Sequence, residues 1–145
     1  MNDVSEYRFS PVSEECHARL EAYADALRPV AVTDGGIRLN EKLHAGCYVR
    51  TVKIPADMVV VSDRIECDTL LIVNGDCVFT DSNKAVRITG YRVLLGARGR
   101  QSLIRTLSDT YLTMIFATDA KTFEEAQAYF SADPSRLTKF PFEEI

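Results

Sequence analysis

Short runs rich in Val, Ile, Thr and Tyr occupy the middle of the chain, from position 30 to position 118, and turn residues separate them. Runs of about four to eight such residues are typical of β-strands. Many short strands at this spacing favour an antiparallel sandwich or barrel over a fold in which strands and helices alternate. We predict strands at 30–33, 47–54, 58–65, 69–73, 76–80, 85–88, 91–95, 101–106 and 110–117.

Turn residues between these runs indicate how the strands connect. Asn74-Gly75 separates two runs by two residues, which is the strongest short signal for a hairpin because both positions of a type I′ turn need a positive φ. Asp81-Ser82-Asn83 and Thr89-Gly90 predict further turns, and Gly96-Ala97-Arg98-Gly99 predicts a longer loop. Residues 70–73 are apolar on both faces of the predicted strand, so we expect this strand to lie centrally in the sheet.

Helical periodicity predicts one helix near each end of the chain. Ser13 is a suitable N-cap for the first helix (13–28), in which apolar residues recur at helical spacing. The second helix (122–131) begins at the capping box Thr122-Phe123-Glu124-Glu125. Two arrangements of the first helix stay open, because it docks either on the body of the protein or against a second copy in a dimer.

Composition places the whole chain, residues 1–145, in a single globular domain. The chain is 46% hydrophobic and 26% charged. We divide it into an N-terminal helical extension (1–29), a β-barrel (30–118) and a C-terminal helix and tail (119–145). No apolar run approaches the roughly 18–20 residues of a membrane helix, and the start lacks the features of a secretory signal, so we expect a cytoplasmic protein without membrane contact. The cysteines form no C-x-x-C pair, so we expect free thiols at Cys16, Cys47, Cys67 and Cys77.

Charge is spread unevenly along the chain. With 17 basic and 21 acidic residues the formal net charge is −4, which weighs against generic nucleic-acid binding. Residues 83–107 nevertheless contain bases and no acid, and this segment is either a solvated face or a local site for an anion or an acidic partner. Its basic residues are Lys84, Arg87, Arg92, Arg98, Arg100 and Arg105.

Two motifs in the predicted β region follow a known spacing. In the first, Ile54-Pro55-Ala56-Asp57 precedes Asp63-Arg64-Ile65, Asp68 and Gly75. This segment resembles the cupin barrel, in particular small cupin-like proteins carried by bacteriophages of proteobacteria. Those relatives have an I-P-A-G turn, then H-x-H, a glutamate and a glycine. Asp63 and Ile65 therefore stand at the histidine positions, and Asp68 stands at the glutamate position.

The second cupin motif keeps its rhythm as well. Gly90 opens it, Ala97-Arg98-Gly99 stands for P-x-G, Ser102 replaces the histidine and Thr106 replaces the asparagine. The resemblance covers roughly residues 44–130. It implies a mainly β fold: a cupin-like antiparallel β-barrel, also called a double-stranded β-helix or jelly roll, with an N-terminal and a C-terminal helix.

The positions that hold the metal in cupins carry unsuitable residues here. A cupin metal needs neutral imidazoles and one carboxylate that converge inside the barrel. This chain offers two carboxylates, an aliphatic side chain and a hydroxyl, at Asp63, Asp68, Ile65 and Ser102. We therefore predict a protein without metal or other cofactor. A weakly held divalent cation on the two carboxylates stays open as an alternative.

Our first functional hypothesis is a non-catalytic, metal-free cupin-like module that forms a homo-oligomer, most simply a dimer, and binds another macromolecule. The extra N-terminal helix and the tail with Phe140 and Phe142 favour it, because an aromatic tail docks either on its own chain or on a neighbouring subunit. The resemblance implies a phage-encoded protein, either a virion component or an accessory protein in the host cytoplasm, with a phage or host protein as partner.

The alternative hypothesis is a barrel that sequesters a small anionic ligand such as a nucleotide, as a phage counter-defence protein would. Its candidate binding residues are Asp63, Arg64, Arg92, Arg98, Arg100 and Arg105. A further expectation concerns the interior, where Asp63 would pair with Arg105 in place of the metal. The third hypothesis, an enzyme, needs Asp63 and Asp68 as an acid–base pair, and we place it last.

Overall fold

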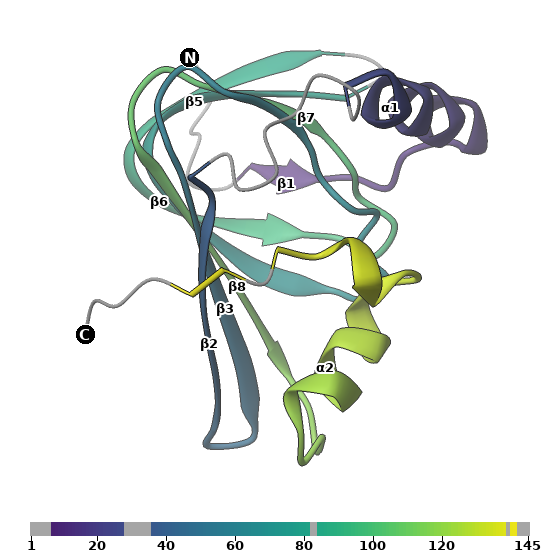
Figure 1. Ribbon diagram of the computed structural model, residues 1–145, viewed down its shortest axis with the longest axis vertical. Coiled ribbons are helices and arrows are strands. Elements are labelled where there is room, and N and C mark those ends of the chain that lie inside the picture. The colour runs from purple at the N-terminus through teal and green to yellow at the C-terminus, as the bar shows by residue number, and fades with distance from the viewer. Residues whose placement is uncertain (1–6, 28–35, 82–83, 139, 142–145) are drawn as a thin grey trace.

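A computed structural model describes residues 7–27, 36–81, 84–138 and 140–141 (Figure 1). Its helices are α1 (Glu14–Leu27), α2 (Phe123–Phe130) and a short 3-10 helix, η3 (Pro134–Arg136). The strands are β1 (Arg8–Phe9), β2 (Arg38–His44), β3 (Cys47–Ile54), β4 (Val59–Val61), β5 (Thr69–Thr80), β6 (Ala85–Gly96), β7 (Leu103–Thr106) and β8 (Thr110–Ala117). The fold is mainly β with two α-helices, as predicted.

The strands form a bent sheet in the order β1-β6-β5-β8-β3-β2, while β4 pairs with β7 and β7 pairs with β5. The long strand β5 belongs to both parts, since its residues 70–74 pair with β8 and its residues 77–80 pair with β7. Pairing is antiparallel except for the short β1, which runs parallel to β6. Within the described residues, hydrogen bonds do not close the sheet, so the predicted barrel is an open one.

The predicted hairpin at Asn74-Gly75 is wrong, because both residues lie inside β5. Gly75 is paired with Gly90 of β6, so the predicted turn at Thr89-Gly90 is wrong as well. Glycine is required at position 75 for a steric reason and not for a turn. A Cβ there would lie 2.5 Å from Oγ1 and 2.8 Å from Cα of Thr110. Glycine permits this close approach of two backbones where β5 leaves β8 and bends toward β7.

Strand β2 was missed by the sequence pattern, and the predicted strand 30–33 lies outside the described residues. In β2 the inward positions carry Leu39, Glu41 and Leu43, and a carboxylate between two leucines hides the apolar alternation. The predicted strands 69–73 and 76–80 are one strand, β5, and 85–88 and 91–95 are one strand, β6.

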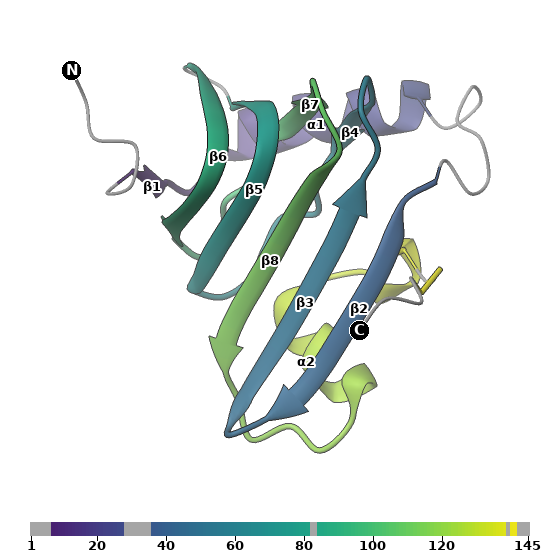
Figure 2. The same ribbon diagram turned by 90° about the vertical axis from the view of Figure 1, so that its left-hand side faces the viewer.

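Both α-helices lie close to their predicted limits. Ser13 caps α1, since its Oγ accepts a hydrogen bond from the Cys16 backbone N–H at 3.0 Å. Thr122 caps α2 in the same way, with the Glu125 N–H donating at 3.1 Å. Both helices lie on the same side of the sheet β6-β5-β8-β3-β2 and leave its other side uncovered (Figure 2). No helix in the described part of the chain is long and apolar enough to cross a membrane.

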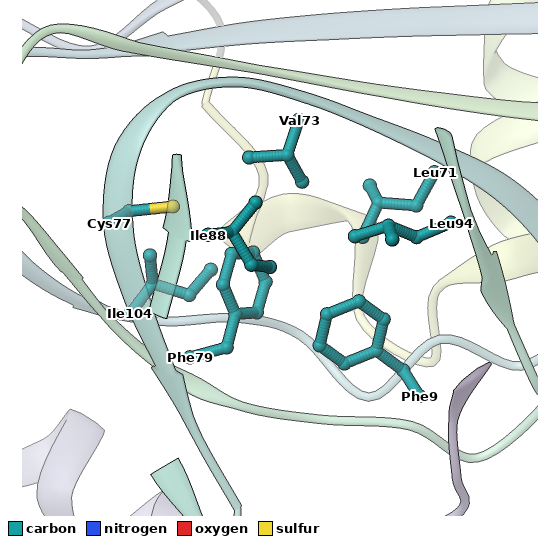
Figure 3. Close-up of a cluster of buried hydrophobic side chains, with 8 residues drawn as sticks. All are labelled: Phe9, Leu71, Val73, Cys77, Phe79, Ile88, Leu94 and Ile104. Carbon is teal, nitrogen blue, oxygen red and sulfur yellow. The ribbon is translucent and has the colours of Figure 1, made fainter. Parts of the chain in front are cut away.

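Two clusters of buried side chains form the core. The first lies between the two parts of the bent sheet, where its side chains point toward one another (Figure 3): Phe9, Leu71, Val73, Cys77, Phe79, Ile88, Leu94 and Ile104. The second lies between β3, β8 and α2: Tyr48, Ile65, Cys67, Met114, Phe116, Ala126 and Phe130. All four cysteines are free; three are buried, as expected of buried free thiols, whereas Cys47 is half-buried.

Candidate functional site

A cavity of about 230 Å³ lies between the two core clusters, inside the curve of the bent sheet. We call it the interior cavity. Its wall is mostly apolar and takes Leu71, Phe79 and Ile104 from the first cluster and Ile65, Met114 and Phe130 from the second. Its polar side chains come from β3, from the loop after β4, from the loop before β7 and from the segment after α2. They are Arg50, Ser62, Asp63, Arg100, Arg136 and Thr138.

Arg100 is the most unusual polar residue of this wall. Arg100 is only 8% exposed. Its sole hydrogen bond to a described side chain is donated by Nη2 to Thr69 Oγ1, at 3.1 Å. The buried Nε–H has no partner, and no described carboxylate forms an ion pair with the guanidinium. Burial lowers the pKa of Arg100 from 12.5 to about 10, so the side chain is still charged at neutral pH.

The local backbone explains how this arginine enters the interior. Residues 97–99 of the predicted loop Gly96–Gly99 follow β6, and the Arg100 C=O accepts a hydrogen bond from the Ile65 N–H at 3.0 Å. The side chain then passes over Gly96, where a Cβ would lie 2.7 Å from Thr69 Oγ1 and 2.9 Å from Arg100 Cδ. Gly96 therefore leaves the space through which the guanidinium reaches the cavity.

Arg50, on β3, is the second buried cation, and its surroundings differ. It is 5% exposed, and its Nη1 and Nη2 donate to the Tyr48 hydroxyl and to the Thr138 C=O, each at 3.3 Å. The guanidinium carbon lies 5.8 Å from the centre of the Phe130 ring, a cation–π distance. The Tyr48 hydroxyl donates in turn to Glu41 Oε1 at 2.9 Å, which links Arg50 to a negative charge through one side chain.

The C-terminal segment after α2 supplies part of the cavity wall. Leu137 and Thr138 line the cavity, and the Phe140 C=O accepts a hydrogen bond from the Leu39 N–H at 2.7 Å. The Arg38 guanidinium lies 5.7 Å from the centre of the Phe140 ring. Of the two open arrangements of the tail, docking on its own chain therefore holds for Phe140, while Phe142 lies outside the described residues.

Asp63 lies at the edge of the cavity and accepts a hydrogen bond from the Ser131 hydroxyl. Burial raises the pKa of Asp63, and the bond from Ser131 opposes that rise. The expected ion pair with Arg105 does not form, because Arg105 is exposed on β7 and does not line the cavity. Alternation along β7 turns Ile104 inward and Arg105 outward.

The other candidate arginines lie elsewhere. Arg64 pairs with Glu14 at 2.9 Å and Glu66 at 3.2 Å, and thereby ties the loop after β4 to α1. The partly buried Arg92 donates to the Tyr91 C=O, and Arg98 is exposed in the loop after β6. Of the basic residues in the acid-free segment 83–107, the cavity wall contains Arg100 alone.

The residues that the resemblance aligns with the metal ligands of cupins do not fit a transition metal. Asp63 and Ile65 line the cavity, whereas Asp68 is exposed and accepts a hydrogen bond from the Arg98 N–H at 2.8 Å, and Ser102 lies outside the cavity wall. In the part of the chain that the structure describes, no three His, Cys, Asp or Glu side chains come together as metal ligands. Asp63 and Asp68 also do not share one cavity, so no paired carboxylates face a common substrate.

Sequence reasoning missed Arg50, although a signal was present. In the predicted strand 47–54 the alternate residues Tyr48, Arg50, Val52 and Ile54 share one face, and three of them are apolar or aromatic. An arginine on such a face points into the protein. The strand therefore already indicated a buried cation, which the search for acid-free segments passed over.

The fold is similar to that of solved cupin structures. A cupin superfamily protein from Desulfitobacterium hafniense is 14% identical over 61% of this chain and 84% of that chain, with a TM-score of 0.48. The Cnp3 cupin domain of Schizosaccharomyces pombe is 19% identical over 69% and 72%, with a TM-score of 0.46. Salicylate 1,2-dioxygenase from Pseudoaminobacter salicylatoxidans, solved as a gentisate adduct, is 12% identical over 90% and 38%, with a TM-score of 0.50.

Neither protein-family models nor curated proteins match the sequence. At these identities the structural likeness shows the fold alone, and it confirms the predicted cupin-like architecture.

Proposed function

We propose that this protein is a non-catalytic cupin-like binding module whose interior cavity holds a small organic anion. One observation carries the proposal: Arg100 is a buried cation with an unpartnered Nε–H and no described carboxylate beside it. An uncompensated buried charge costs several kcal/mol. A bound anion would compensate the charge of Arg100 and remove that cost, so an arginine at this position favours anion binding.

The cavity wall supports a ligand that is mostly apolar. Small-molecule sites are concave and largely apolar, with a few polar groups that fix the orientation of the ligand. The interior cavity has this composition, because Leu71, Phe79, Ile104 and Met114 form its body while Arg100 supplies a charge. We propose no reaction at this site, since Asp68, the second carboxylate that acid–base chemistry would use, lies outside the cavity wall.

The test is thermal unfolding of dialysed protein with a panel of small organic and inorganic anions. A ligand at 100 times its Kd adds about 2.7 kcal/mol of stability, which is a clear rise in Tm. We expect at least one anion to raise the Tm of the wild type and of the exposed-arginine control Arg105→Met, but not of Arg100→Met. A panel in which no anion raises the Tm of the wild type would overturn the proposal.

We propose further that two copies of the chain pack through the uncovered face of the sheet, as the predicted homo-oligomer requires. Leu70, Tyr91, Val93, Leu95 and Tyr111 are exposed there, on the neighbouring strands β6, β5 and β8. Leu70 lies opposite Leu95, so the apolar surface continues from strand to strand. Exposed apolar patches of this kind are typical of protein contacts. A phage or host protein as partner, and a location in the host cytoplasm or the virion, stay predictions from the resemblance.

Light scattering tests this second proposal. The wild type should have the mass of a dimer, and Leu70→Lys should be a monomer that is still folded, because the side chain is exposed on the outer face. Lys42→Glu, on the polar outer face of β2, is the control and should stay dimeric. A monomeric wild type would contradict the proposal.

A further inference from the structure

The size of the interior cavity limits what it can hold. Its volume is about 230 Å³. An engineered protein cavity of about 150 Å³ is large enough for benzene, and pockets for drug-sized ligands have about 300–1,000 Å³. The cavity is partly open to solvent, and its volume fits a molecule somewhat larger than benzene, whereas a nucleotide would extend out of it.

The cations of the wall limit the charge of the ligand. Arg136 pairs with Glu21 at 2.6 Å, and both terminal nitrogens of Arg50 donate to Tyr48 and Thr138. Arg100 is left as the one cavity cation whose Nε and Nη1 make no hydrogen bond to described residues. One uncompensated positive charge matches one negative charge on the ligand.

Asp63 strengthens this limit. Its carboxyl group is part of the same cavity wall and forms no ion pair with Arg100, so the wall as a whole is less favourable to a second negative charge on the ligand. Phosphate monoesters carry about −1.5 to −2 charge at pH 7, which is more than Arg100 alone balances. A carboxylate carries one charge, which Arg100 can balance through Nη1, the guanidinium nitrogen that is neither bonded to Thr69 nor buried like Nε.

We infer that the ligand of the interior cavity is a compact organic monocarboxylate, with its carboxylate on Arg100 and its apolar body against Leu71, Phe79, Ile104 and Met114. The inference rests on the proposed anion-binding function and narrows it to one chemical class. It also predicts that nucleotides, which the sequence suggested as ligands, bind more weakly than compact monocarboxylates.

Isothermal titration calorimetry with a matched set of probes tests this inference. Hexanoate and benzoate are monocarboxylates of suitable size, and benzamide is the neutral counterpart of benzoate. Adenosine monophosphate and inorganic phosphate represent the phosphorylated alternatives. We expect hexanoate or benzoate to bind the wild type and Arg105→Met with a measurable Kd, and we expect at least a tenfold weaker binding of benzamide and of both phosphates.

Two variants place the binding inside the cavity. Arg100→Met removes the charge and should abolish carboxylate binding. Val52→Phe, at an inward position of β3 in the cavity wall, fills the space without touching Arg100 and should weaken binding at least tenfold. Circular dichroism shows whether each variant is folded, and either folded variant suffices for the test.

The outcomes separate the two levels of the proposal. Binding of phosphate or adenosine monophosphate in an Arg100-dependent manner, without binding of either carboxylate, would overturn the ligand class and leave the anion-binding function in place. Carboxylate binding that survives in Arg100→Met or in Val52→Phe would overturn the assigned position. Absence of binding by every anion would overturn both.

Discussion

Two buried arginines, Arg50 and Arg100, line the same cavity. The surroundings of Arg50 provide several hydrogen-bond and aromatic partners for its charge, and those of Arg100 provide few. Around Arg50, a tyrosine hydroxyl, a backbone C=O and an aromatic ring provide partners, and Glu41 follows one side chain further. Around Arg100, the Thr69 hydroxyl is the one hydrogen-bonding side chain among the residues that the structure describes. Satisfied buried groups stabilise a fold, whereas unsatisfied ones destabilise it. The comparison therefore assigns structure to the Arg50 region and ligand binding to the Arg100 region.

The largest effect should come from the Arg50 region. Arg50→Met removes two hydrogen bonds from a charged donor and leaves the Thr138 C=O without its partner. Hydrogen bonds to charged groups contribute about 1.5–3 kcal/mol each, so the variant should lose about 3 kcal/mol of unfolding free energy. Urea denaturation measures this loss. A change below about 0.5 kcal/mol would mean that the Arg50 region is not a structural anchor.

The buried thiols make the protein sensitive to alkaline pH. Burial raises the pKa of Cys67 and of Cys77 from 9.0 to about 11. The unfolded chain loses these protons near pH 9 and the folded chain keeps them until about pH 11, so stability is fully present below pH 9 and falls between pH 9 and 11. Because one pKa unit corresponds to about 1.4 kcal/mol, each thiol should contribute about 2 kcal/mol to this fall.

The pH dependence of Cys67 also depends on Arg100. Burial raises the pKa of Cys67, and the nearby positive charge of Arg100 lowers it. Cys67→Ala should remove roughly half of the loss in unfolding free energy between pH 8.5 and pH 9.5, below the pH at which the buried Arg100 loses its proton, measured by urea denaturation at each pH. Arg100→Met should instead raise the folded-state pKa of Cys67, so the loss attributed to Cys67 still starts near pH 9 but continues to higher pH and becomes larger. An unchanged pH profile in Cys67→Ala would show that this thiol is not held protonated by the fold.

A smaller effect is expected at Gly96, which gives Arg100 its path into the cavity. Gly96→Ala places a methyl group against the side chains of Arg100 and Thr69 and should cost about 1–2 kcal/mol of unfolding free energy. In a double-mutant cycle with Arg100→Met the cost should shrink, because the crowded guanidinium is gone. An equal loss of unfolding free energy with and without Arg100 would mean that glycine is needed at position 96 for the backbone conformation and not to make room for the Arg100 side chain.

Much of this fold followed from local patterns in the sequence. The caps at Ser13 and Thr122 predicted both α-helices, because capping depends on neighbouring residues alone. The same local reasoning failed at Asn74-Gly75. Glycine is needed there because the backbone of Thr110, a residue distant in the sequence, leaves no room for a Cβ. The run 70–73 is central in the sheet as predicted, but Leu70 is 45% exposed, because no element of the described chain covers the outer face.

The candidate site was harder to predict than the fold. Asp63 and Arg100 were among the predicted residues that the structure brings to one cavity, whereas Arg105 points outward because its neighbour Ile104 points inward. A run of bases in the sequence does not tell which side chain each strand turns to the interior. Arg50 was visible from strand alternation, but whether a buried arginine has partners depends on residues as distant as Thr138.

The most direct test of the account is the unfolding free energy of Arg100→Met relative to the wild type, both dialysed free of small ligands. A buried charge without a partner costs several kcal/mol, so replacing Arg100 by an apolar side chain of similar volume should be neutral or stabilising. The account predicts that Arg100→Met unfolds at the same urea concentration as the wild type or at a higher one, in contrast to Arg50→Met. A loss of about 2 kcal/mol or more in Arg100→Met would contradict it, because the protein itself would then be satisfying the charge.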